Sequence, residues 1–238
     1  MMESDLYLDL IKKSLLNAIY QDDNYNDKAR ENGKDWPQKA HTMIGLKRLN
    51  NIQFCIEDVL EKNIPGDVIE TGVWRGGATI LMRAILKVHG DTQRTVWVAD
   101  SFCGLPKPSG LYPADEGDMH HSVQFLAVSL DQVKVNFQRY GLLDNQVQFL
   151  AGWFKDTLPN APIEQLSVLR LDGDMYESTM QALVILYPKL STGGYVIIDD
   201  YGELPNCKKA VTDFRSENNI TDIIHEIDAT GIYWKKSK

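Results

Sequence analysis

From about Gly66 onward, short apolar runs rich in β-branched residues alternate with longer segments whose apolar residues recur every three or four positions. This alternation is typical of βαβ units around a parallel sheet. The predicted strands are Asp67–Glu70, Thr95–Asp100, Gln146–Leu150, Ser167–Asp172 and Gly194–Asp199. The predicted helices are Ala78–Lys87, Leu130–Tyr140, Glu177–Lys189 and Pro205–Glu217. The pattern therefore predicts an α/β fold with a mainly parallel sheet and helices on both faces.

Both ends of the chain depart from this alternation. Asp222–Asp228 and Ile232–Lys235 are strand-like and are separated by a tight turn, which predicts a hairpin and an antiparallel last strand. Residues 1–62 contain two amphipathic helical patterns, Leu6–Ile19 and Ile44–Leu60, on either side of a polar stretch. We therefore predict an N-terminal helical extension at 1–62, acting as a cap or lid, and a catalytic domain at 63–238.

Composition narrows the class of protein. The chain has 238 residues, of which 43% are hydrophobic and 24% charged, and this suits one α/β domain with additions. A formal charge of -8 without a basic cluster argues against a nucleic-acid partner. The three cysteines are widely spaced and odd in number, and neither a signal peptide nor a membrane-spanning run is evident. We expect a cytoplasmic enzyme that binds neither nucleic acid nor membrane.

Acidic residues end two of the predicted strands. Asp172 closes one strand, and Asp199 and Asp200 close the next. Because the carboxyl ends of parallel strands meet at one edge of the sheet, these side chains are expected to lie together. Magnesium prefers oxygen ligands and often takes only a few carboxylates. The sequence therefore predicts a magnesium site.

A Gly-rich turn after the first predicted strand is the strongest nucleotide-binding signal. It runs from Glu70 to Gly77 and opens a helix, whose first amides are unpaired. Trp74 replaces the second glycine of a dinucleotide fingerprint, which leaves less room for a pyrophosphate. Glu70 would instead suit an ammonium group, such as the amino-acid end of S-adenosylmethionine, and Asp100 could accept both ribose hydroxyls. The alternative is a turn that only closes a tight corner.

Six collinear segments carry a resemblance to a known family. They are His41–Gly45, Gly66–Gly77, Val96–Phe102, Gly152–Thr157, Leu171–Asp174 and Ile197–Tyr201. Along nearly its whole length the chain resembles the macrocin O-methyltransferase family, sugar methyltransferases of macrolide and aminocoumarin antibiotic biosynthesis. The resemblance implies a Rossmann-like class I methyltransferase fold, S-adenosylmethionine as donor and a bound magnesium ion. It also implies that the acceptor is a hydroxyl of a deoxysugar on a natural product.

Residue roles follow from the resemblance as expectations. In the donor site, Thr42 and Met43 would form a flap, and Glu70, Thr71 and Gly72 would contact the donor at the turn. Asp100 would bind the ribose, and Ser101, Phe102, Gly152 and Trp153 would lie near the adenine. Asp172 would also contact the donor. Asp172, Asp199 and Asp200 would hold the ion. Asp174 would then act as general base, since the ion favours the deprotonated hydroxyl. Each acid taken alone could also be a loop starter or helix cap.

Three alternatives stay open. Leu171–Asp174 also resembles the nucleophile motif of magnesium-dependent phosphatases, although that motif normally ends the first strand of its domain. Catechol and phenol O-methyltransferases share the paired strand-end ligands, but they are expected to carry lysine and asparagine where this chain has Asp174 and Asp200. The third alternative is a non-catalytic binding module.

The shape of the acceptor that can bind depends on two segments. They are the loop Phe102–Gln124, which is expected to be a lid or binding loop, and the polar stretch Gln21–Gln38. By analogy we expect a homodimer or larger assembly.

Overall fold

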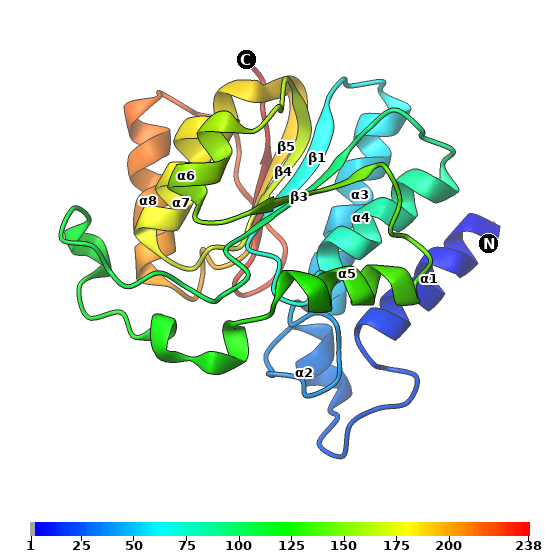
Figure 1. The fold of residues 1–238 in the computed structure, drawn as a ribbon. Coiled ribbons are helices and arrows are strands. Elements are labelled where there is room, and N and C mark those ends of the chain that lie inside the picture. Colours follow the sequence, from blue (N-terminus) through cyan, green and yellow to red (C-terminus); the bar gives the residue numbers. More distant parts are fainter. Residues whose placement is uncertain (1–2) are drawn as a thin grey trace.

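The computed structural model describes residues 3–238, so the first two residues of the predicted segment 1–62 lie outside the described part. Seven strands form one sheet in the order β3-β2-β1-β4-β5-β7-β6 (Figure 1). They are β1 Asp67–Thr71, β2 Val96–Asp100, β3 Val147–Ala151, β4 Leu166–Leu171, β5 Leu190–Ile198, β6 His225–Glu226 and β7 Ile232–Lys235. Strands β1 to β5 are parallel, and β7 runs antiparallel to β5.

Helices cover both faces of the sheet (Figure 1). They are α1 Glu3–Leu15, α2 Asp27–Glu31, α3 Leu46–Glu61, α4 Gly77–Val88, α5 Leu130–Arg139, α6 Phe154–Thr157, α7 Tyr176–Leu186 and α8 Pro205–Glu217. Neighbouring strand residues face opposite layers, because Val68 packs with α1, α3, α4 and α5 while Ile69 packs with α7 and α8. A sheet buried on both faces explains why its strands are apolar throughout rather than alternating.

The N-terminal helices share the core of the sheet domain. Leu8 of α1 and Ile52 of α3 are buried in the same apolar cluster as Val68 of β1 and Leu81 of α4. This packing comes from the apolar stripe that the sequence showed in both helices. Residues 3–61 therefore form part of one layer of the molecule. No helix among residues 3–238 is long and apolar enough to cross a bilayer.

Several predicted elements were wrong in extent. The helix predicted at Leu6–Ile19 spans Glu3–Leu15, and the strand predicted to begin at Gly194 begins at Leu190. The strand predicted at Asp222–Asp228 pairs only at His225 and Glu226, at the edge of the sheet, and Ile223 before them is 74% exposed. The helix predicted to reach Lys189 ends at Leu186 and continues as a short 3-10 helix, Tyr187–Lys189. Pro188 explains this end, since proline lacks the amide that an α-helix interior needs.

Candidate functional site

The site begins where the strand order reverses, between β1 and β4, the position at which open α/β sheets bind ligands. Thr71 and Leu171 are paired there, and the amide of Asp172 donates to the carbonyl of Thr71 at 2.9 Å. Gly72 has φ of 85°, and a Cβ added to it would lie 1.7 Å from the Asp172 carbonyl oxygen. Only glycine lets these two strand ends approach so closely.

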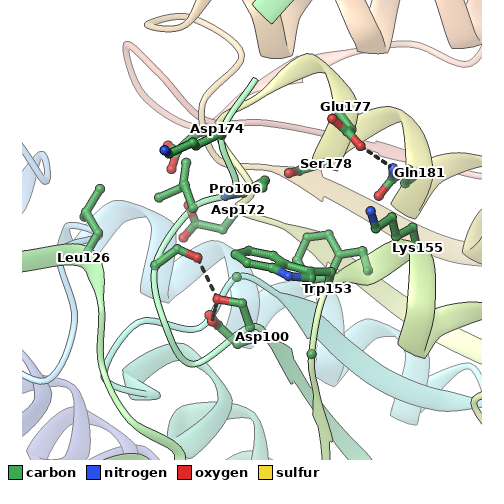
Figure 2. Close-up of a pocket in the computed structure, with 18 of the residues that line it drawn as sticks. Asp100, Pro106, Leu126, Trp153, Lys155, Asp172, Asp174, Glu177, Ser178 and Gln181 are labelled. Atoms are coloured by element: carbon green, nitrogen blue, oxygen red, sulfur yellow. Dashed lines mark hydrogen bonds between the residues drawn. The ribbon is translucent and has the colours of Figure 1, made fainter. Parts of the chain in front are cut away.

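A cleft opens above this junction, with about 980 Å³ of empty space when its open mouth is included (Figure 2). Seven of the residues predicted to bind the donor line it, namely Met43, Gly72, Asp100, Ser101, Gly152, Trp153 and Asp172. The other four lie outside its lining: Thr42, Glu70 and Thr71 are buried, and Phe102 packs against Phe149. The turn after β1 and the ends of β2, β3 and β4 thus form one wall of a ligand-sized cleft.

Asp100 is fixed by the backbone around it. Its carboxylate accepts the amides of Val73 and Phe102, each at 2.7 Å, and so ties the turn after β1 to the turn after β2. Burial raises the pKa of Asp100, and these amide bonds partly offset that effect. The carboxylate is therefore held at the rim of the cleft in a defined orientation.

Arg170, in the middle of β4, is a functional residue that sequence reasoning missed. It is fully buried and pairs with Glu70, Asp172 and Asp199, with the Asp172 contact at 2.9 Å. Burial raises the pKa of Glu70 to about 8, and Arg170 partly offsets this. Glu70 thus lies beneath the cleft against a cation of the protein itself. The sequence signal was an arginine inside an apolar strand, because such a residue is seldom buried without partners.

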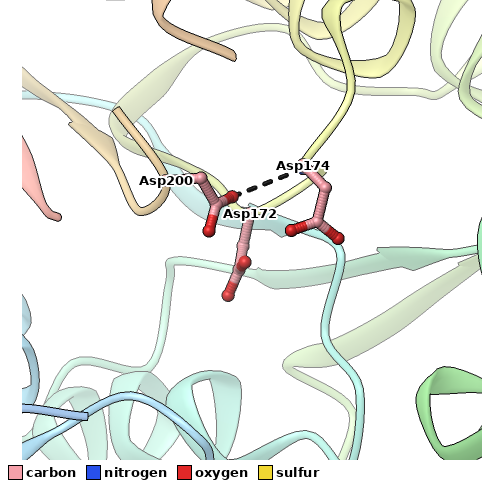
Figure 3. A group of neighbouring side chains, drawn as sticks. All are labelled: Asp172, Asp174 and Asp200. Atoms are coloured by element: carbon pink, nitrogen blue, oxygen red, sulfur yellow. Dashed lines mark hydrogen bonds between the residues drawn. The ribbon is translucent and has the colours of Figure 1, made fainter. Parts of the chain in front are cut away.

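Three aspartates cluster beside Gly72. Oxygens of Asp172, Asp174 and Asp200 lie within 4.8 Å of one another (Figure 3). Asp174 has φ of 59°, and its amide donates to Asp200 at 3.3 Å. Asp199 is 4% exposed and its carboxylate instead pairs with Arg48 and Arg170. Of the three predicted metal ligands, the structure therefore brings two together with the predicted base, while Asp199 faces the arginines.

Burial and mutual repulsion perturb this acid cluster. The pKa of Asp172 rises to about 6 and that of Asp174 to about 7, in each case chiefly through burial and then through a neighbouring carboxylate. The pKa of Asp200 is raised well above its usual value for the same reasons. Hard oxygen donors at this spacing, each destabilised when ionised, are suited to a divalent cation that would neutralise them.

A second cleft meets the first at these acids. It encloses about 1390 Å³, its open mouth included, and runs past Asp200 and His120 to the loop around Trp36. The residues that line both clefts are Met43, Leu126, Asp172 and Asp174. Two ligands, one in each cleft, would therefore approach each other at Asp172 and Asp174.

Two supporting residues come from distant parts of the chain. Arg48 of α3 is buried and pairs with Asp199 and, at 3.0 Å, with Asp228 before the last strand. Asp115, in the loop after β2, accepts the amides of Tyr176 and Glu177 at 2.7 and 2.9 Å and so caps α7. The loop predicted to be a lid is therefore anchored at its middle. Nothing in the local sequence marks either residue.

Comparison with known proteins extends this description. The family model for macrocin-O-methyltransferase (TylF) matches residues 21–236. The chain belongs to this family. It is 56% identical to 8-demethyl-8-(2,3-dimethoxy-alpha-L-rhamnosyl)-tetracenomycin-C 4'-O-methyltransferase of Streptomyces olivaceus, over 97% of this chain and 92% of the relative. It is 51% identical to demethyldecarbamoylnovobiocin O-methyltransferase of Streptomyces niveus, over 99% and 95% of the two chains.

The fold agrees with this membership. The solved structure of the O-methyltransferase NovP matches with a TM-score of 0.97 and 53% identity, and the match covers 99% of this chain and 100% of that one. The predicted family and the predicted Rossmann-like methyltransferase fold are confirmed. The protein is an O-methyltransferase.

Proposed function

We propose that this O-methyltransferase transfers the methyl group of S-adenosylmethionine to a sugar hydroxyl of a glycosylated natural product, and that it uses a magnesium ion. The observation that carries the proposal is the meeting of two clefts at Asp172 and Asp174. The first cleft lies at the strand-order reversal, where folds of this kind bind nucleotides. The second leads from the same acids to the N-terminal segment, which we propose as the cap over the acceptor.

The first cleft supports binding of the donor. Asp100 keeps an acceptor position for a ribose hydroxyl, since a carboxylate can accept about four hydrogen bonds and the amides of Val73 and Phe102 and the hydroxyl of Ser101 use three of them. Trp153 offers a flat face for the adenine beside Gly152. Glu70 is paired with buried Arg170, so we assign it a supporting role beneath the cleft rather than a direct contact. When bound, the donor supplies the methyl group on a sulfonium.

The acid cluster supports binding of magnesium. We assign Asp172, Asp199 and Asp200 as its ligands. Asp172 and Asp200 face the junction of the clefts, and Asp199, although paired with two arginines, has lone pairs left on each oxygen. When bound, the ion would act as a Lewis acid that favours deprotonation of a hydroxyl in contact with it.

Asp174 is the proposed general base. It lines both clefts beside the proposed ligand Asp172, so its carboxylate can reach a hydroxyl placed at their junction. In this role its carboxylate takes the proton of the acceptor hydroxyl. The rest of catalysis is positioning, because the hydroxyl oxygen must lie in line with the donor methyl. Met43 and Leu126, which line both clefts, would exclude water from that line.

The acceptor class is proposed from the relatives. One is named for a rhamnosyl tetracenomycin and another for demethyldecarbamoylnovobiocin. We propose a deoxysugar glycoside for this chain also. The second cleft has a cavity volume of about 540 Å³, which lies within the size range of small-molecule pockets and gives room for a sugar.

The test uses S-adenosylmethionine with a labelled methyl group, a panel of deoxysugar glycosides and a catechol. Label should enter a glycoside, stop entering it when EDTA is present and return on addition of magnesium. Label in the catechol alone would change the acceptor to a phenol. A methylation rate unaffected by EDTA would show that the reaction needs no magnesium. Phosphate release from phosphomonoesters without any methylation would overturn the whole proposal.

We also propose a homodimer or larger assembly formed through the outer faces of α1 and α3. Leu6 and Leu10 of α1 are 56% and 54% exposed, and Phe54 of α3 is 48% exposed. Lys12 joins the two helices through Asn50 and Gln53, which fixes α1 against α3. Gel filtration of the wild type and of Leu10→Glu tests this, since a monomeric wild type would exclude it.

A further inference from the structure

Three aromatic side chains from distant segments meet beside the turn after β1. The rings of Trp36 and Phe125 are stacked, with centroids 5.5 Å apart, and the rings of Trp74 and Phe125 lie 5.4 Å apart. The indole nitrogen of Trp74 donates to the carbonyl of Phe125 at 2.9 Å. With Arg75 these residues form what we call the aromatic bridge. It joins the polar N-terminal stretch to the end of the loop after β2.

Arg75 holds the bridge together. Its guanidinium lies 4.1 Å from the ring centroid of Trp74 and 5.3 Å from that of Phe125. The same group donates to the carbonyls of Pro37, Gln38 and Ala40 at 3.3, 3.0 and 2.7 Å. Lysine could not reproduce this, because only the planar guanidinium combines ring stacking with several directed donors. The backbone of residues 37–40 is thus attached to the turn after β1.

The bridge lies in the walls of both clefts. Trp74 lines the first cleft and Trp36 the second, and Phe125 contacts both rings. Leu126, next to Phe125, lines both clefts and faces the junction acids (Figure 2). Residues 33–36 line the second cleft and not the first. A ligand in the first cleft therefore touches one end of the bridge without touching the other.

Trp74, at the first-cleft end of the aromatic bridge, has a strained backbone conformation that its contacts must stabilise. Its φ of 46° is in the left-handed region, which costs a residue other than glycine free energy of about 1 kcal/mol or more. The indole hydrogen bond and the stacked guanidinium offset that cost. A ligand packed against Trp74 would add to the same restraint and favour the assembled bridge.

We propose that the aromatic bridge couples the two clefts, so that occupancy of the donor cleft orders the Trp36 wall of the acceptor cleft before the acceptor enters. Phe125 and Arg75 are positioning residues in this scheme, which rests on the proposed function. Coupling between sites is reciprocal, so an acceptor in the second cleft would strengthen donor binding by the same factor.

The experiment measures amide hydrogen exchange of the full chain with and without S-adenosylhomocysteine, whose binding is followed separately by calorimetry. In the wild type, exchange in residues 34–40 should slow roughly 5- to 150-fold when the ligand binds, the range usual for coupled sites. Phe125→Leu should still bind the ligand but lose this protection. Phe125→Tyr keeps the aromatic face and should retain it, and Arg75→Lys should lose it. Phe214→Leu, whose ring packs on Tyr187 away from both clefts, is the matched control.

Two results would overturn the coupling. One is a wild type that binds S-adenosylhomocysteine without protecting residues 34–40. The other is protection that survives in Phe125→Leu, which would mean that the rings only fill space. Absence of any binding by the wild type would overturn the proposed function and the coupling with it. The calorimetric titration distinguishes that case from the first two.

Discussion

Replacing the proposed base should stabilise the metal-free protein while it abolishes catalysis. Asp174→Asn removes one carboxylate from a cluster whose oxygens lie within 4.8 Å of one another. The methyl-transfer rate should fall about 10²- to 10⁴-fold, as expected when a general base is lost. The fold, in contrast, should gain stability, because an ionised Asp174 is less favourable in the folded protein than in the unfolded chain.

The size and pH dependence of this gain follow from the pKa of Asp174. Folding raises it from 3.8 to about 7. The difference corresponds to about 4 kcal/mol, at about 1.36 kcal/mol for each pKa unit. Burial is the largest cause of this difference, and repulsion from the Asp172 carboxylate adds to it. Because the folded pKa is the higher one, the wild type loses this stability as pH rises from about 4 to 7, and the loss is complete above 7.

The assay is thermal unfolding in EDTA at pH 5 and pH 8. Asp174→Asn should unfold roughly 10 °C above the wild type at pH 8, and the gain should be much smaller at pH 5. Glu164→Gln removes an exposed carboxylate before β4 and should change neither value. An Asp174→Asn protein no more stable than the wild type at pH 8, or a gain of equal size at both pH values, would refute the electrostatic reasoning.

Three further predictions test the scaffold of the site. Gly72→Ala should destabilise the protein by about 3 kcal/mol in thermal melts and weaken ligand binding, whereas Gly90→Ala, also left-handed but with nothing within 4 Å of its added Cβ, should be far milder. Asp100→Ala should weaken S-adenosylhomocysteine binding roughly 10- to 100-fold by calorimetry and leave magnesium-dependent stabilisation intact. An unchanged affinity would show that Asp100 does not bind the ribose. Asp115→Ala should cost about 1 to 2 kcal/mol and speed proteolysis of the loop after β2, while an unaltered cleavage rate would argue against the cap as its anchor.

The strands and most helices could be predicted because their signals are local. Apolar runs and helical periodicity lie within ten or fifteen neighbouring residues, and the chemistry at the ends of β1, β2 and β4 follows from them. The supporting ion pairs could not be predicted in this way. Arg170 and Glu70 are 100 residues apart in sequence, and Arg48 and Asp199 are 151 apart. No local pattern records a pairing over such distances.

The two acids after β5 show the limit most clearly. The sequence predicted that Asp199 and Asp200 would both hold the ion, although neighbouring residues at a strand end tend to face opposite sides of a sheet. Both line the second cleft, but Asp199 also pairs with the arginines of α3 and β4. The structure turns Asp199 to those arginines and Asp200 to the junction of the clefts. The sequence alone predicted both acids at the site, but not that only Asp199 would pair with the arginines.

The capping contact of Asp115 has a practical consequence for redesigning substrate choice. Asp115 divides the loop after β2, since Gly104, Leu105 and Ser109 before it line the first cleft and His120 after it lines the second. Exchanging residues 116–124 between relatives should therefore change the second cleft, while Phe125 and Leu126, which also contact the first cleft or its lining residue Trp74, are kept. A graft that replaced Asp115 as well would leave the amides of Tyr176 and Glu177 without their partner. Residues 116–124 are therefore the unit to transplant, with Asp115, Phe125 and Leu126 kept unchanged.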